Sequence, residues 1–189
     1  IADLQKSLSL ESDPTKKEML NKDVTNNQSQ LAELNQAKVH LTDAVTELGM
    51  MKNSTQLFKV RDNFKGGGST TYDTKGNAVL IRFDGEFSSI GHELKHGAQF
   101  LSGELSFDRK TGNAGNLADL FDEQGAYHRQ LALDPNSFNR PNIKFSDITR
   151  PKIQNQREGN SFPYADFPDE NRTKSNYKGD LSNDIIFQK

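Results

Sequence analysis

Cysteine and tryptophan are both absent from this chain of 189 residues. Without cysteine, no disulfide bond can form, and no thiol can bind a metal ion or act as a nucleophile. Apolar runs of the roughly 20 residues that cross a membrane are absent too, as are basic runs interleaved with aromatic residues. We therefore expect that this chain does not span a membrane and that nucleic acid is not one of its partners.

Net charge and apolar residues are also scarce. The sequence has 24 Lys and Arg against 26 Asp and Glu, and only 32% of its residues are hydrophobic. This length and polarity predict one domain with a modest core and with extended or loosely packed ends. The chain starts at Ile1 without an initiator methionine or a signal-peptide pattern, so we expect it to be a piece of a longer protein.

The segment from Ser88 to Gly103 carries the most information in the sequence. Its pattern predicts an amphipathic helix, with Ser88 or Ser89 as the N-cap and Gly103 just past the last turn. The centre of this helix reads His-Glu-Leu-Lys-His over residues 92–96. The apolar residues at helical spacing are Ile90, Leu94, Ala98 and Leu101.

Residues four apart on a helix lie one above the other, so His92 and His96 direct two imidazoles at one point. Glu93 is rotated by about a quarter turn towards the same cleft. A zinc-activated water needs this arrangement, with two nitrogen ligands and a carboxylate that takes the proton of the water. We therefore predict a Zn²⁺ site here; the alternative is a pair of surface histidines.

An N-terminal helical region is predicted over residues 1–55. Asp13 and Pro14 are typical of an N-cap and a first helical position, and the following residues to about Met51 favour a long helix. A break near residues 25–27 would turn it into a helical hairpin. Two apolar heptad series, interrupted at Asn27 and Lys38, leave two interpretations open: a helix packed on the body, or a coiled coil with a partner.

A catalytic core is predicted over residues 56–135, and it starts with a small antiparallel sheet. Residues 56–62, 70–73 and 78–83 are strand-like, and residues 74–77 form a hairpin turn between the last two runs. The run 78–83 leads directly into the histidine helix. We expect this strand to lie along the cleft, where its edge can hold an extended peptide substrate.

A second helix is predicted from about Asn116 to Leu133, ended by Asp134 and Pro135. It is acid-rich, and a catalytic zinc ion usually has a third protein ligand. Glu123 is the predicted third ligand, with Asp119, one turn earlier, as the alternative. The polar segment 136–189 is predicted to wrap over the core in extended stretches, with partial disorder as the alternative.

An oxyanion stabiliser is also needed, and Tyr127 is the first candidate because it lies one turn from Glu123. Its alternative role is aromatic packing between helices. His128 and Tyr72 are the other candidates for this role, although His128 is better explained as a surface or outer-shell histidine. His40 is expected at a polar position of the long helix, and Asp119 can also orient a ligand histidine.

Two segments together resemble a known group of enzymes. Residues 91–99 read Gly-His-Glu-Leu-Lys-His-Gly-Ala-Gln, and residues 122–130 read Asp-Glu-Gln-Gly-Ala-Tyr-His-Arg-Gln. They resemble the two metal-binding helices of gluzincin-type zincins, and more closely the zinc metallopeptidase-like domains at the C-termini of Rhs-type polymorphic toxins and among secreted bacterial effectors. The resemblance covers about residues 70–133. Lys95 and Gly97 depart from it, since Lys95 must face solvent and Gly97 weakens the helix.

The resemblance implies a zincin-like α+β fold with two active-site helices and a long N-terminal helix or hairpin. Zn²⁺ on His92, His96 and Glu123, with Glu93 as general base and Tyr127 beside them, then hydrolyses a peptide bond in a protein or peptide substrate. It further implies secretion or delivery by a bacterial secretion system, and an immunity protein that blocks the cleft. We expect a monomer. The alternatives are a non-enzymatic interaction module with a structural or vestigial zinc site, and another zinc-dependent hydrolase.

Overall fold

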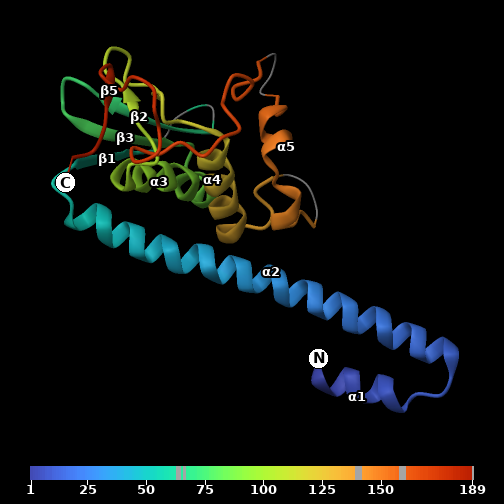
Figure 1. The fold of residues 1–189 in the computed structure, drawn as a ribbon. Helices are drawn as coiled ribbons and strands as arrows, with labels where there is room; N and C mark the ends of the chain where they lie inside the picture. The colour runs from blue at the N-terminus through green and yellow to red at the C-terminus, as the bar shows by residue number, and fades with distance from the viewer. Residues whose placement is uncertain (63–64, 66, 139–141, 158–160, 189) are drawn as a thin grey trace.

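The computed structural model describes residues 1–189 except 63–64, 66, 139–141, 158–160 and 189. The described chain has a mixed α+β architecture with five α-helices, a three-stranded sheet and a two-stranded sheet (Figure 1). The predicted α+β class and the long N-terminal helix are therefore confirmed. Among the described residues, no helix combines the length and the apolar character that a membrane span needs.

The N-terminal region is a helical hairpin of α1 (Ala2–Leu10) and α2 (Pro14–Asn53). The Asp13 carboxylate accepts hydrogen bonds from the backbone N–H groups of Thr15 and Lys16, which confirms the predicted start of the long helix. The hairpin turn lies before Asp13, because α2 continues without a break through residues 25–27. The sequence does not predict α1 as a separate helix, because α1 buries no residue and so has no clear apolar period.

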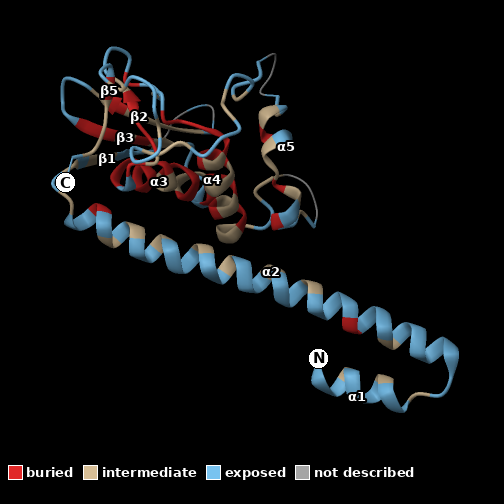
Figure 2. Cartoon of the chain, viewed as in Figure 1, coloured by how far each residue is buried: buried red, intermediate tan, exposed pale blue. Residues whose placement is uncertain are grey.

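Helix α2 packs against the body with its C-terminal half and projects beyond it at the other end (Figures 1 and 2). Glu33 accepts a hydrogen bond from the backbone N–H of Phe145, and Met51 is buried in the core. The packing interpretation of this helix is thus confirmed. Leu34 and Val45, which belong to the two heptad series, stay exposed, and the coiled coil with a partner stays a prediction.

The main sheet contains β1 (Leu57–Arg61), β2 (Gly68–Asp73) and β3 (Ala78–Phe83) in the order β1-β3-β2. Strands β2 and β3 form the predicted antiparallel hairpin, but β1 runs parallel to β3. The prediction of an antiparallel sheet is therefore wrong. After β1 the chain crosses to the opposite edge of the sheet and forms β2 there, and β3 then returns between β1 and β2. Strand β3 is consequently central and cannot offer a free edge to a substrate.

Helix α3 (Phe87–Ser102) carries the two predicted ligand histidines. It begins after Glu86 without a side-chain cap, so the predicted caps Ser88 and Ser89 are wrong. Ser88 is buried within the first turn, and the Ser89 hydroxyl donates to the carbonyl of Gly67 instead. The end of the helix is as predicted, since Gly103 adopts the left-handed conformation with φ of 81°.

Helix α4 (Leu120–Leu133) is the predicted second helix, with a later start. The Asp119 carboxylate caps it by accepting hydrogen bonds from the backbone N–H groups of Phe121 and Asp122. Helices α3 and α4 pack closely at Gly91, where a Cβ atom would overlap the Leu133 side chain. The absence of a side chain at residue 91 therefore leaves the space that the Leu133 side chain occupies between the two helices.

Replacing Gly91 with alanine is expected to lower the free energy of unfolding by about 1–3 kcal/mol, the usual cost of overpacking a core. Gly49→Ala is the matched control, because Gly49 is also helical but has no heavy atom near its missing Cβ. That change should raise the free energy of unfolding by up to about 1 kcal/mol through helix propensity. Urea denaturation of both variants measures the difference. Equal effects of the two changes would contradict the close packing.

The C-terminal segment covers the core in short elements joined by extended stretches (Figure 1). Its last strand pairs with β4, where the buried Asp184 carboxylate accepts hydrogen bonds from the Ser106 hydroxyl and the Asn116 backbone N–H. The role of residues 136–189 as a segment that wraps the core stays a prediction. The elements of this segment are the 3-10 helix η1 (Phe145–Asp147), α5 (Arg150–Gln154) and β5 (Asp184–Ile185), whereas β4 (Phe107–Asp108) lies between α3 and α4.

Candidate metal centre

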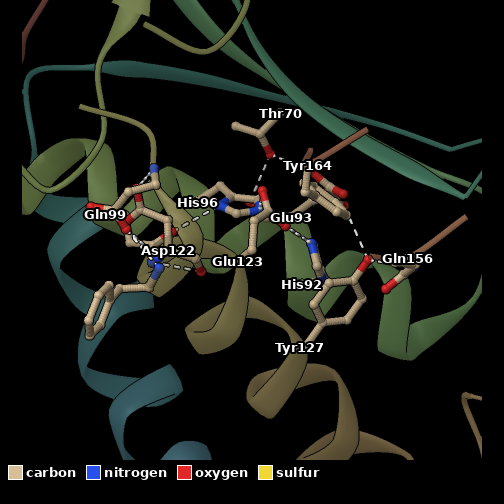
Figure 3. A network of polar contacts seen from close by, with 12 residues as sticks. Thr70, His92, Glu93, His96, Gln99, Asp122, Glu123, Tyr127, Gln156 and Tyr164 are labelled. Atoms are coloured by element: carbon tan, nitrogen blue, oxygen red, sulfur yellow. Dashed lines mark hydrogen bonds and ion pairs between the residues drawn. The ribbon is translucent and has the colours of Figure 1, made fainter. Parts of the chain in front are cut away.

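Helices α3 and α4 bring His92, His96 and Glu123 together as predicted, and all three side chains are buried (Figure 3). The Nε2 atoms of the two histidines are 3.2 Å apart. The Glu123 carboxylate lies 3.5 Å from each of these nitrogens, through Oε2 for His92 and Oε1 for His96. Three side chains with ligand atoms of the types that zinc prefers thus converge on one point.

These separations fit a shared metal ion. Tetrahedral zinc with ligand bonds of about 2.0–2.1 Å places its ligand atoms about 3.3 Å from one another. Glu123 Oε2 is buried and has no hydrogen-bond partner among the described residues, as expected for an atom whose partner is a cation. Within the described chain, this is the only group of three such side chains with ligand atoms close enough together for one ion.

The electrostatics of the three side chains also favour a cation. Burial lowers the pKa of His96, but the neighbouring Glu123 carboxylate outweighs this effect and raises the pKa to about 10. Burial acts to raise the pKa of Glu123, and the two histidines overcome it and hold that pKa well below its usual range. The negative charge of Glu123 therefore requires a positive partner, and a bound metal ion would replace the proton on His96.

Gln99 fixes the orientation of His96. Its amide oxygen lies 2.9 Å from His96 Nδ1, and its amide nitrogen donates to the backbone carbonyl of Asp122 at 3.1 Å. The Gln99 amide nitrogen donates to the Asp122 carbonyl, so the Gln99 oxygen is the atom that faces His96 and accepts from its Nδ1–H. With the proton on Nδ1, the lone pair of His96 Nε2 is available to bind a metal ion. The sequence motif of the histidine helix does not by itself assign a role to Gln99. Its position three residues after His96, on the same helix face, was the signal.

Replacing Gln99 with leucine is expected to weaken zinc binding by about 10–100-fold, the usual loss for an outer-shell partner of a ligand histidine. Gln124→Leu is the matched control, because the Gln124 amide donates to the Ile148 carbonyl and does not contact the histidines. A competition titration with a chromogenic chelator measures both affinities. A zinc affinity that is unchanged in Gln99→Leu would exclude this role.

Glu93 is buried next to the histidines, and the Thr70 hydroxyl donates to its Oε2 at 2.7 Å. Thr70 belongs to β2, and β2 also passes Glu93 at Gly68, where a Cβ would lie 2.5 Å from Glu93 Oε1. The strand beside the site is therefore β2, and the prediction of residues 78–83 for this role is wrong. Only a residue without a side chain lets the backbone approach the glutamate so closely.

A cleft of about 540 Å³ opens over this group. Its walls come from the start of β2, the first turns of α3, the middle of α4 and the C-terminal segment. His92 and Glu93 line it together with Ser137, Gln156 and Tyr164 from the C-terminal segment. The candidate site is thus open to a ligand, and four separate parts of the chain form the walls of its cleft.

Tyr127 lies directly beside the three converging side chains. Its ring meets the His92 ring edge-on, with the centroids 4.6 Å apart. Its hydroxyl accepts a hydrogen bond from the Gln156 amide at 2.9 Å and lies 3.1 Å from the Tyr164 hydroxyl (Figure 3). Neither Gln156 nor Tyr164 belongs to a sequence motif, so no local pattern predicts them at the site. The Tyr72 hydroxyl donates to Asn77 Oδ1 outside the cleft.

Asp119 is neither a ligand nor a partner of a ligand histidine, because its carboxylate caps α4 and accepts from the Arg172 backbone. Both alternatives for Asp119 are wrong. His128 contacts the carbonyl of Phe145 through Nε2 and packs against the ring of His40. Burial lowers the pKa of both histidines, to about 4 for His40, where the charges of His128 and Arg129 add to the effect. These two histidines are structural.

The prediction that Lys95 faces solvent is wrong. Its ammonium group contacts the Glu47 carboxylate of α2 at 2.6 Å, and Arg129 of α4 contacts the other oxygen of Glu47 at 2.9 Å. One carboxylate therefore joins α3 and α4 to α2. Gly97 is also explained by packing, because a Cβ there would lie 3.1 Å from the Met51 side chain and 3.3 Å from that of Ile81.

Comparisons with known proteins do not assign this chain to a family. No protein-family model, no curated protein and no solved structure matches it. The geometry of the site is therefore the main support for its function, and the resemblance to zincins and Rhs-associated domains stays a prediction.

Proposed function

We propose that this chain is a zinc-dependent hydrolase that cleaves peptide bonds. One observation carries the proposal: two imidazole nitrogens and a carboxylate lie 3.2–3.5 Å from one another, next to a second buried glutamate, in an open cleft. A structural zinc site usually has four protein ligands and is closed, whereas a catalytic site has three and leaves one position open. Three ligands beside a cleft favour the catalytic kind.

Each residue of the site has a distinct role in this proposal. His92, His96 and Glu123 hold the metal ion, and Gln99 keeps His96 in the required tautomer. A zinc ion lowers the pKa of water and polarises a carbonyl group when it is bound at such a site. Glu93 accepts a proton from the attacking water and passes it to the leaving amine, while the Thr70 hydroxyl fixes its carboxylate.

The free edge of β2 supports an extended peptide as the substrate. Strand β2 pairs with β3 on one side, and in the described chain its other edge has a backbone hydrogen bond only at Tyr72, from its N–H to the Gly112 carbonyl. The Gly68 end of the strand lies beside Glu93 and lines the cleft. A peptide that adds to this edge would pass directly over the general base.

We further propose that the hydrolase is a toxin or effector that a bacterial secretion system delivers, with an immunity protein that blocks the cleft. The support is the resemblance of residues 91–99 and 122–130 to the zinc metallopeptidase-like domains of such proteins. The target protein is identified by the experiment that follows.

Zinc loading and peptide cleavage test this function together. The purified protein is loaded with one equivalent of Zn²⁺ and incubated with a bacterial or host lysate, and mass spectrometry identifies new peptide termini. We expect cleavage that stops after dialysis against a chelator and returns with zinc. If the protein binds one equivalent of zinc but produces no new peptide termini, the zinc site is structural. If the protein binds no zinc, both the zinc site and the zinc-dependent hydrolase are excluded.

A further inference from the structure

We propose that a hollow between α4 and α5 binds a carboxylate of the peptide substrate through the guanidinium group of Arg157. The inference rests on the proposed hydrolysis and names the class of peptide that the enzyme prefers. The carboxylate belongs either to an acidic side chain or to the C-terminus of the substrate, because both present the same pair of oxygens to a guanidinium group.

The hollow is continuous with the cleft over the metal centre. It has a volume of about 570 Å³, and its walls come from α4, from the chain between α4 and α5, and from α5 with the residues that follow it. Helices α4 and α5 contact each other, and Figure 1 shows them side by side. Three residues line both spaces, namely Tyr127, Phe138 and Gln156. A peptide bound in the cleft therefore has a direct path into the hollow.

A short series of contacts links Arg157 to the metal centre. The rings of His92 and Tyr127 have their centroids 4.6 Å apart, and the Gln156 amide donates to the Tyr127 hydroxyl at 2.9 Å (Figure 3). Arg157 follows Gln156 directly in the chain and lines the hollow. The guanidinium group is thus within reach of a substrate residue a few positions away from the bond that is cleaved.

Arg157 supplies the uncompensated charge of the hollow. The other two charged side chains in its described wall, Lys152 and Asp147, lie 3.6 Å apart and compensate each other. Arg157 is exposed, and among the described residues its guanidinium group has no carboxylate partner; it lies 5.2 Å from the centre of the Phe162 ring. The described wall of the cleft contains no lysine or arginine. A carboxylate of a bound peptide is therefore complemented in the hollow and not in the cleft.

Apolar side chains next to Arg157 strengthen the proposed contact. Four of them line the hollow, namely Phe138, Ile143, Ile148 and Ile153. A peptide that packs on these side chains displaces water from around the guanidinium group, and charges attract each other more strongly where water is excluded. A guanidinium group also binds both oxygens of a carboxylate in one plane. The contact should therefore contribute more to substrate binding than an ion pair on an open surface does.

Paired peptides test the proposal with the zinc-loaded full chain. A peptide that the wild type cleaves is synthesised with glutamate or glutamine at each position in turn, and also with a free or an amidated C-terminus. For one of these pairs, kcat/KM should be about 10-fold higher for the peptide with the carboxylate, the usual effect of a hydrogen bond to a charged group. A glutamate pair identifies an acidic side chain as the ligand, and the terminal pair identifies the C-terminus.

Reversal of the charge separates recognition from a structural effect. In Arg157→Glu the peptide with the carboxylate should become the poorer substrate of its pair, with zinc affinity unchanged. Arg61→Glu is the matched control and should keep the wild-type preference, since Arg61 is an exposed arginine at the end of β1, outside both spaces. If the wild type cleaves peptides without this preference, or if Arg157→Glu keeps it, the carboxylate site is wrong and the proposed hydrolysis stands. If the wild type cleaves no peptide, the hydrolysis fails and the carboxylate site fails with it.

Discussion

Replacing Glu93 with glutamine is expected to lower kcat by about 10²–10⁴-fold, the usual contribution of a general base. Glutamine has the shape of glutamate but cannot accept a proton from water at neutral pH. Its amide oxygen can still accept the hydrogen bond that the Thr70 hydroxyl donates to Glu93. We therefore expect a folded protein with unchanged zinc affinity and almost no hydrolysis.

Glu86→Gln is the matched control for this variant. Glu86 also lines the cleft, but it lies before the first turn of α3 and is exposed. Initial rates with saturating peptide, together with thermal unfolding and zinc titration, compare the two variants. If Glu93→Gln keeps wild-type kcat, the proposed base is wrong. If both variants lose activity equally, the effect comes from the charge of the cleft.

Replacing Glu123 with glutamine is expected to weaken zinc binding by more than the 10–100-fold that loss of an outer-shell partner costs. The change replaces a carboxylate ligand by a neutral amide. It also removes the negative charge that stabilises the buried His92 and His96 in their positions. Activity should fall with occupancy, so excess zinc should restore part of it.

Asp119→Ala is the matched control because Asp119 is an acidic residue one turn earlier, and its side chain caps the helix. It should lose about 1 kcal/mol of stability with the helix cap and retain the zinc affinity of the wild type. Competition titration and urea denaturation measure the two effects separately. A larger loss of zinc affinity in Asp119→Ala than in Glu123→Gln would make Asp119 the third ligand.

Local patterns sufficed for those parts of the site that belong to one helix. His92 and His96 share a helix face because they are four residues apart, and the apolar stripe beside them places that face against the core. Gly103 marks the helix end because its left-handed conformation favours a residue without a side chain. Glu123 was found because the site still lacked a ligand and α4 offered an acidic turn.

Local sequence patterns do not predict the order of the strands or the residues that form the walls of the cleft. The sequence of β3 shows a buried strand, but it does not show that β1 pairs with it in parallel and leaves β2 beside Glu93. Pairing depends on which strands meet in space, and no local pattern records that. Gln156 and Tyr164 lie in a polar segment without periodicity, and only the fold brings them to His92.

A crystal of the zinc-loaded protein, measured on both sides of the zinc absorption edge, tests the central claim most directly. The proposed centre predicts one anomalous peak about 2.0–2.2 Å from His92 Nε2, His96 Nε2 and a Glu123 oxygen. The fourth position should face the cleft beside Glu93. A crystal without zinc at this point, or with zinc bound by other residues, would contradict the account.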